Sequence, residues 1–135
     1  GVKPFLVASS TRAIMAQRLV RRICEKCKDP YKATDAELRL LGPAAQQFAE
    51  AQLLRGKGCN DCGFTGYRSR MGIFEMFTIN DEVRHLIYER VSATELRSKA
   101  RSLGMRTLRE DGLRKVIAGA TTLQEVLRVT MGDVD

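Results

Sequence analysis

The sequence is poor in aromatic and histidine side chains. It has five phenylalanines, three tyrosines, no tryptophan and a single histidine, His85, among its 135 residues. Nucleic-acid binders combine basic residues with exposed aromatic side chains, so this scarcity weighs against a nucleic-acid interface. No Ser-His-Asp set can be assembled around the lone histidine, which excludes hydrolases of that type. We expect His85 to be an exposed residue of a helix.

Long apolar runs and a phosphate-binding loop are missing as well. No segment approaches the roughly 18–20 apolar residues that a membrane-spanning helix needs, and residues 1–8 lack the apolar core and cleavage site of a signal peptide. The pattern G-x-x-x-x-G-K-[ST] does not occur, so these residues alone are not expected to hydrolyse a nucleotide. The chain begins Gly-Val-Lys-Pro without an initiator methionine, and we interpret it as a piece of a longer protein.

What is present is an ordinary core composition and an uneven charge. Hydrophobic residues make up 44% of the sequence, which suits one compact domain or two small subdomains. The formal net charge is +7, and residues 1–28 alone carry +6 of it. Such a basic segment can meet phosphate groups or an acidic protein face, or it can be a solvated helix face.

The apolar spacing predicts a strand followed by a helix at the N-terminus. Residues 5–8 are a short apolar run after Pro4, which is typical of a buried strand. The spacing of Ile14, Leu19 and Ile23 then predicts a helix with its basic residues turned elsewhere. Because one strand cannot form a sheet, we expect the partners of this strand to lie upstream of the sequence.

The remainder reads as irregular structure followed by short helices. A capping box at residues 34–37 predicts one helix, and a second is expected over residues 44–54. Residues 72–79 predict a strand, with residues 67–70 pairing back on it. Asn80 is expected to cap a helix that ends near Tyr88. Capping boxes at residues 92–95, 107–110 and 122–125 predict three more helices, which end near Gly104, Gly119 and Gly132 respectively. The fold class predicted is α+β and mostly helical.

All four cysteines form two Cys-x-x-Cys pairs, Cys24 with Cys27 and Cys59 with Cys62. Two residues between ligands let both sulfurs of a pair point at one centre, and two such pairs complete a tetrahedron of thiolates. Gly56, Gly58 and Gly63 flank the second pair, where tight turns need backbone without a Cβ atom. We therefore expect one structural zinc ion per chain, in a closed shell with no open position for catalysis.

Three other uses of four cysteines compete with a zinc site. Two disulfides would suit a secreted protein, but nothing in the sequence signals export. A redox-active pair usually follows a strand at the start of a helix, whereas these pairs lie in loops. Iron can occupy the same four sulfurs, so zinc is favoured by availability as much as by geometry.

Several longer motifs occur together: PFLVASS at 4–10, AQRLVRRIC at 16–24, TGYRSRMGIFE at 65–75, MRTLREDGL at 105–113 and TLQEVLRVT at 122–130. With the two cysteine pairs, this series closely resembles the bacterial traffic ATPases of type II secretion and type IV pilus assembly, the GspE/PulE/PilB-like family. The segments EDGLR and VLRVT favour the type II secretion branch.

The resemblance implies a C-terminal part of a hexameric secretion ATPase at the cytoplasmic face of the inner membrane. Residues 1–23 would then be the last strand and helix of the RecA-like core, and residues 24–67 the tetracysteine metal-binding subdomain. Residues 68–80 would be the β connection back to the core, and residues 81–135 the C-terminal helical subdomain, a helical bundle.

The family's phosphate-binding motifs would lie upstream of Gly1, so the resemblance implies that the parent is an enzyme and that this piece is inactive. ATP and Mg²⁺ are cofactors of the full-length parent only. The implied partners are the other subunits of the hexamer and inner-membrane secretion platform proteins, with no nucleic acid and no direct membrane insertion. Hydrolysis would power pseudopilus or pilus assembly and protein secretion across the outer membrane.

The same resemblance gives four arginines candidate roles. Arg18, Arg21, Arg68 and Arg70 are candidates to meet nucleotide phosphates or acidic residues of a neighbouring subunit, because guanidinium groups suit both. The alternative is ion pairing inside this chain. The competing function is a free-standing zinc-ribbon nucleic-acid-binding module, which the basic first segment would favour and a salt-dependent affinity would reveal.

Overall fold

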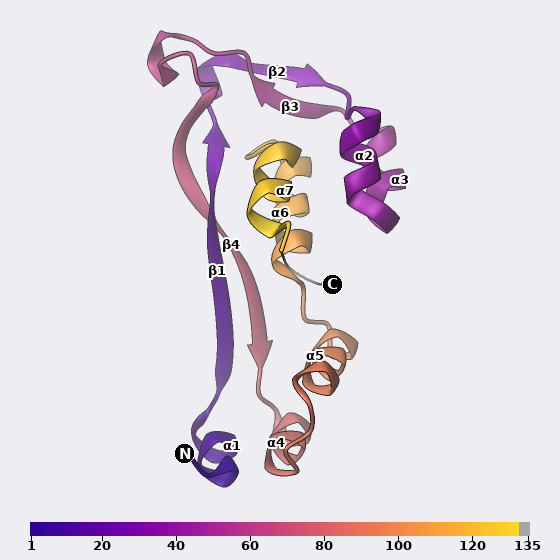
Figure 1. Cartoon of the computed structure of the whole chain (residues 1–135). Coiled ribbons are helices and arrows are strands. Elements are labelled where there is room, and N and C mark those ends of the chain that lie inside the picture. The colour runs from indigo at the N-terminus through magenta and orange to yellow at the C-terminus, as the bar shows by residue number, and fades with distance from the viewer. Residues whose placement is uncertain (133–135) are drawn as a thin grey trace.

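The computed structural model describes residues 1–132, and over these residues the predicted α+β class is confirmed. A long two-stranded antiparallel ribbon, β1 (Ala13–Ile23) with β4 (Tyr67–Thr78), runs along the length of the molecule. A second small sheet lies at one end of it, and most helices lie along one side (Figure 1). The ribbon therefore links the two ends of the fold.

The order predicted for the N-terminus is wrong. Residues 4–10 form a helix, α1 (Pro4–Ser10), and the expected helix is the strand β1. Pro4 suits the first turn of α1, because its fixed φ matches a helix and its missing N–H is not needed there. The apolar residues of β1 do not follow the period of a strand, since Ile14 and Leu19 fall on opposite faces. Pairing with β4, from Ala13↔Thr78 to Ile23↔Tyr67, nevertheless makes the segment a strand.

The strand expected at residues 72–79 is confirmed as part of β4, but its pairing differs from the prediction. Residues 67–70 do not fold back on it, because β4 is one continuous strand. Arg70 lies opposite Arg21 of β1, and Gly72 lies opposite Leu19. The register shifts once, between Arg21 and Ile23, just before the first cysteine.

The second sheet joins β2 (Lys28–Tyr31) to β3 (Leu53–Gly56), with two short helices between them. These are α2 (Asp35–Leu41) and α3 (Ala45–Ala49), separated by a 3₁₀ turn at Gly42–Ala44. The predicted capping box forms in α2. The helix expected over residues 44–54 is shorter than predicted, because the chain becomes extended at Leu53 to pair with β2.

The C-terminal helices begin where their caps predict. They are α4 (Asp81–Tyr88), α5 (Ala93–Ser102), α6 (Leu108–Ile117) and α7 (Leu123–Thr130), and the side chains of Asn80, Ser92, Thr107 and Thr122 each accept a hydrogen bond from the backbone three residues on. Reciprocal capping boxes form at α5 and α6. At α7 only the Thr122 half is present, because the carboxylate of Glu125 points elsewhere.

The main hydrophobic core lies between α6 and α7 on one side and the α2–α3 segment on the other (Figure 1). Its buried residues are Leu41, Phe48, Leu53, Leu113, Val116, Leu123, Val126 and Leu127. At Gly112 a Cβ atom would lie 2.6 Å from the Val126 side chain, so glycine permits the close packing of α6 on α7. The helices inserted between the cysteine pairs thus share one core with the C-terminal helices.

A smaller buried cluster of Val20, Ile73 and Leu108 fixes α6 to the middle of the ribbon. At the far end, α4 packs beside α1 and is followed by α5 (Figure 1). The C-terminal helices therefore lie in two pairs at different places along the ribbon.

Candidate metal centre

The two Cys-x-x-Cys pairs form two matching turns that we call the first knuckle (Cys24–Cys27) and the second knuckle (Cys59–Cys62). Each contains one 3₁₀ turn, at Glu25–Cys27 and at Asn60–Cys62, which brings its two sulfurs to the same side. The first knuckle follows the end of β1, and the second precedes β4. The ribbon and the small sheet therefore bring together cysteines that are 35 residues apart.

The four sulfurs form one compact group, with all Sγ atoms within 4.8 Å of one another. Cys24 to Cys59, Cys27 to Cys62 and Cys59 to Cys62 measure 3.8, 3.9 and 3.7 Å. These distances are far longer than the roughly 2.05 Å bond of a disulfide. In a tetrahedral site with zinc–sulfur bonds of about 2.3 Å, neighbouring sulfurs lie about 3.8 Å apart. The spacing fits four ligands around one metal ion.

Backbone N–H groups point at two of the sulfurs. Gly58 N donates to Cys27 Sγ at 3.3 Å, and both Cys59 N and Gly66 N donate to Cys62 Sγ, at 3.2 and 3.3 Å. Burial by itself raises the pKa of Cys62, but these donors stabilise its thiolate and hold the pKa at about 6. The donors are those a metal-bound thiolate needs, because they spread its negative charge.

The pKa of Cys27 shifts in the opposite direction. Burial and the neighbouring thiols raise the pKa of Cys27 to about 12. Four thiolates cannot be held this close without a cation, so a metal ion would displace the remaining protons when it binds. The donor set and its surroundings therefore fit a metal with a preference for sulfur.

Glycines allow the end of β3 and the residue before β4 to approach each other. A Cβ atom at Gly56 would lie 2.0 Å from the carbonyl oxygen of Gly66, and one at Gly66 would lie 2.5 Å from that of Gly56. Gly58 and Gly66 also have φ values of 96° and 77°, which disfavour other residues. Sequence reasoning identified Gly56 and Gly58 but missed Gly66.

An ion pair that sequence reasoning missed links the knuckles. Lys26 of the first pairs with Asp61 of the second, and this contact raises the pKa of Lys26 and lowers that of Asp61. The two residues occupy the same position in each Cys-x-x-Cys pair, so their opposite charges were a signal available in the sequence. Being exposed, the pair contributes little to stability by itself.

Two of the four candidate arginines are engaged within the chain. Arg18 donates to the carbonyl of Val129. Arg21 donates from its backbone and side chain to Glu125, and its guanidinium lies 4.1 Å from the centre of the Tyr67 ring. These contacts match the alternative in which the arginines pair inside this chain.

The other two arginines are placed differently. Within residues 1–132 the side chains of Arg68 and Arg70 form no hydrogen bond or ion pair. Arg68 lines a cleft of 360 Å³ beside Cys24, together with Arg22 and Lys26. Contact of any of the four with a nucleotide or a neighbouring subunit stays a prediction.

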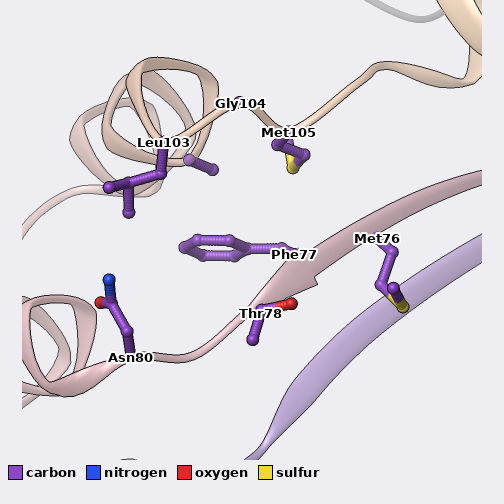
Figure 2. A pocket seen from close by; sticks show the side chains of 8 residues that line it. Met76, Phe77, Thr78, Asn80, Leu103, Gly104 and Met105 are labelled. Carbon is purple, nitrogen blue, oxygen red and sulfur yellow. The ribbon is translucent and has the colours of Figure 1, made fainter.

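The remaining sites offer less chemistry. A cavity of 270 Å³ lies near the end of β4, and none of its lining residues is ionisable. In Figure 2 the ring of Phe77 points toward Leu103 and Asn80. His85 is exposed on α4, as expected, with its Nε2 3.1 Å from Glu89. The cysteine cluster is therefore the candidate functional site.

The sequence is similar to known proteins over most of its length. Residues 1–128 match the family model described as "Type II/IV secretion system protein". The chain is 47% identical to the Type IV pilus assembly ATPase PilB of Thermus thermophilus over 131 residues, 97% of this chain and 15% of that protein. It is 46% identical to Type II secretion system protein E of Pseudomonas aeruginosa over 130 residues, 96% of this chain and 25% of that protein.

The chain is also 38% identical to the Type II secretion system ATPase E of Vibrio cholerae, again over 96% of this chain and 25% of that protein. It thus spans 15–25% of the length of these relatives. None of the helices in residues 1–132 is both long enough and apolar enough to cross a membrane.

Proposed function

The chain belongs to the Type II/IV secretion system protein family, and from that premise we propose that it is the C-terminal part of a secretion ATPase. Hydrolysis by the parent would power pseudopilus or pilus assembly and protein secretion across the outer membrane. The observation that carries the proposal is the match over residues 1–128, which includes both knuckles and most of the C-terminal helices.

In this proposal the four cysteines hold one structural zinc ion per chain. Cys24, Cys27, Cys59 and Cys62 fill all four tetrahedral positions, so the metal stabilises the fold and has no open position for a substrate. Structural zinc sites contribute on the order of 10–16 kcal/mol of apparent binding free energy. That is ample to fix the two knuckles, which contribute only Cys24 and Cys62 to the buried residues.

We propose that residues 1–23 and 68–80 belong to the ATPase core, residues 24–67 to the metal-binding subdomain and residues 81–135 to the helical subdomain. One face of the ribbon supports the first assignment. Met15, Leu19 and Met76 lie on that face and are 61%, 46% and 57% exposed, while Val20 and Ile73 on the other face are buried against α6. An apolar strip of this kind needs a cover, which the rest of the core would provide.

The parent would act as a hexamer at the cytoplasmic face of the inner membrane, with platform proteins as partners and ATP and Mg²⁺ as cofactors. This chain has no phosphate-binding loop and would be inactive alone. Sequence identity does not distinguish the type II secretion branch from the pilus branch. The chain is 47% identical to a pilus assembly ATPase and 46% identical to a type II secretion system protein. The segments EDGLR and VLRVT favour type II secretion.

A chimera tests the function and the branch together. The 130 matching residues of the Pseudomonas aeruginosa protein, and the 131 of the Thermus thermophilus protein, are each replaced by this chain in the corresponding deletion strain. We expect restored secretion in the first. The matched control is the same chimera with Cys24→Ser and Cys59→Ser, which should fail. Restored piliation alone would assign the pilus branch, and folded chimeras that restore neither process would overturn the proposal.

The isolated chain tests the remaining points. With ATP and Mg²⁺ we expect no hydrolysis, and turnover by the pure protein would contradict the proposal of an inactive piece. Elemental analysis should give one zinc per chain. Iron in place of zinc would mean that the site binds a different metal, and a chain without any metal would contradict the metal site itself. A DNA or RNA affinity that falls steeply with salt would instead favour the nucleic-acid-binding module.

A further inference from the structure

We propose that Glu125 and the turn between α6 and α7 (residues 118–122) hold the first knuckle in position, so that metal binding and docking of α7 are coupled. We call this group the α7 clamp: residues 118–122 and Glu125 of the helical pair, with Arg21 and Ile23 of β1 and Tyr67 of β4. The inference rests on the metal site of the proposed function and adds residues far from the cysteines in the sequence.

Glu125 is the centre of the α7 clamp. Its side chain is fully buried, although it stands in the first turn of a helix where a capping box was expected. Its oxygens accept from Arg21 N at 2.9 Å and Arg21 Nη2 at 2.8 Å, and from both Nε and Nη2 of Arg128. A buried carboxylate is costly unless it is paired and hydrogen-bonded in this way. Its carboxylate therefore ties α7 to the strand instead of capping its own helix.

The turn before α7 adds three more contacts at the same level. Thr121 Oγ1 donates to the carbonyl of Arg21 at 2.8 Å, and Ile23 N donates to the carbonyl of Ala120 at 3.0 Å. Tyr67 Oη lies 2.9 Å from Thr122 Oγ1. The strand register shifts between Arg21 and Ile23, so backbone groups at this irregularity are satisfied by the turn. Both strands of the ribbon are thus held at one level.

That level is where the strands enter the metal site. Cys24 directly follows Ile23, and its N–H donates to the carbonyl of Gly66 at 3.0 Å. Gly66 precedes Tyr67 and donates its own N–H to Cys62 Sγ. Ile23 of the clamp is therefore adjacent to the ligand Cys24. Tyr67 of the clamp is adjacent to Gly66, which donates a hydrogen bond to the ligand Cys62. A metal site tolerates displacements of only about 0.5 Å, so the position of these strand ends sets its affinity.

Coupling between two sites is reciprocal. If docking of α7 strengthens metal binding by some factor, metal binding must strengthen docking of α7 by the same factor. The clamp gives this linkage a physical route that does not pass through the main core. Metal binding at the four cysteines and docking of α7 are then coupled, and Glu125 is a positioning residue for the metal site.

The first test compares zinc affinity, measured by competition with a chromophoric chelator, in two matched variants. Glu125→Gln keeps the shape of the side chain and removes its charge. Glu110→Gln removes the charge of a carboxylate that also binds one arginine, Arg101, through both oxygens, but at the start of α6. We expect about tenfold weaker zinc binding for Glu125→Gln, the lower end of the range for residues that orient ligands. Glu110→Gln should bind zinc like the wild type.

A second pair of variants keeps the test decisive if Glu125→Gln does not fold. Thr121→Val removes the hydrogen bond to the carbonyl of Arg21, and Thr121→Ser retains it. Weaker zinc binding with valine and recovery with serine are expected, at unchanged helical content by circular dichroism. Zinc affinities equal to the wild type in folded Glu125→Gln and Thr121→Val proteins would overturn the inference.

The reciprocal arm uses the wild-type chain. Amide hydrogen exchange of residues 123–130 should slow when zinc is added, and the effect should shrink in Thr121→Val. Exchange that does not respond to zinc would contradict the coupling. If the wild type binds no zinc at all, the proposed metal site itself fails, and that outcome is distinct from equal binding by wild type and variants.

Discussion

At the scale of single residues, the metal site depends on two glycines without Cβ atoms as well as on the four cysteine sulfurs. The segments before and after the second knuckle meet at Gly56 and Gly66, where neither position has room for a Cβ atom. The cysteine spacing is local, so it predicted the four candidate ligands. Gly66 could not be identified from spacing, because its contact with Gly56 forms only when the segments on both sides of the second knuckle fold together.

Gly66→Ala should therefore damage the site more than an alanine at a comparable glycine. Its Cβ atom would collide with the carbonyl of Gly56, and its φ of 77° adds backbone strain of about 1–2 kcal/mol. Gly63→Ala is the control, because Gly63 also has a positive φ, 57°, but open space around it. We expect Gly66→Ala to lower the melting temperature and the zinc affinity well below those of Gly63→Ala. Equal effects in both variants would show that strain alone matters.

At the scale of elements, local signals predicted the C-terminal helices α4 to α7 and failed for the helix α1 and the strand β1. The caps at Asn80, Ser92 and Thr107 bind backbone groups three residues away, so the sequence contains the whole interaction. Strand β1 is determined by β4, which lies more than forty residues further along the chain. Glu125 is subject to both local and distant interactions. Its local sequence predicted a capping box, but its carboxylate binds Arg21, 104 residues away, instead.

The docking of α7 should depend on pH through that residue. Burial alone raises the pKa of Glu125, but hydrogen bonds from Arg21 and Arg128 hold it at about 2, below its ordinary value of 4.5. A carboxyl with a lowered folded pKa stabilises the fold above its unfolded pKa and loses that contribution as the pH falls toward the folded one. We expect the wild type to lose on the order of 3 kcal/mol of unfolding free energy between pH 4.5 and 2 relative to Glu125→Gln.

Urea unfolding of both proteins across this range measures the difference directly. Both proteins are measured without metal, because the expected difference in their zinc affinities would otherwise add to the difference in unfolding free energy. A difference that stays constant with pH would mean that Glu125 has the same pKa in the folded and unfolded protein, which would contradict this prediction.

At the scale of the whole molecule, the segment between the knuckles is joined to the C-terminal helices. Leu41, Phe48 and Leu53 from that segment lie in the same core as Val116 and Val126. Boundaries drawn from the sequence separate these residues, because they follow composition and motif order. The packing across residues 24–67 and 81–132 depends on which apolar faces meet, and periodicity within one helix does not contain that information.

Removal of the metal should therefore loosen more than the knuckles. With a chelator present, we expect amide exchange to accelerate in α2, α3, α6 and α7 together, because they share one core and the α7 clamp. Helices α4 and α5 lie at the other end of the ribbon and should keep their protection (Figure 1). Faster exchange confined to residues 24–67, with α6 and α7 unchanged, would contradict this shared response.

The pairing of β1 with β4 also has a consequence during synthesis. The first residue of β1 pairs with Thr78, so β1 leaves the ribosome long before its partner exists. At about 5–20 residues per second, the wait lasts on the order of 3–13 s. Over that time an apolar strand is open to aggregation, and charged residues protect such segments. Arg18, Arg21 and Arg22 stand in β1 itself, so its positive charge keeps the nascent strand apart from others until β4 is made.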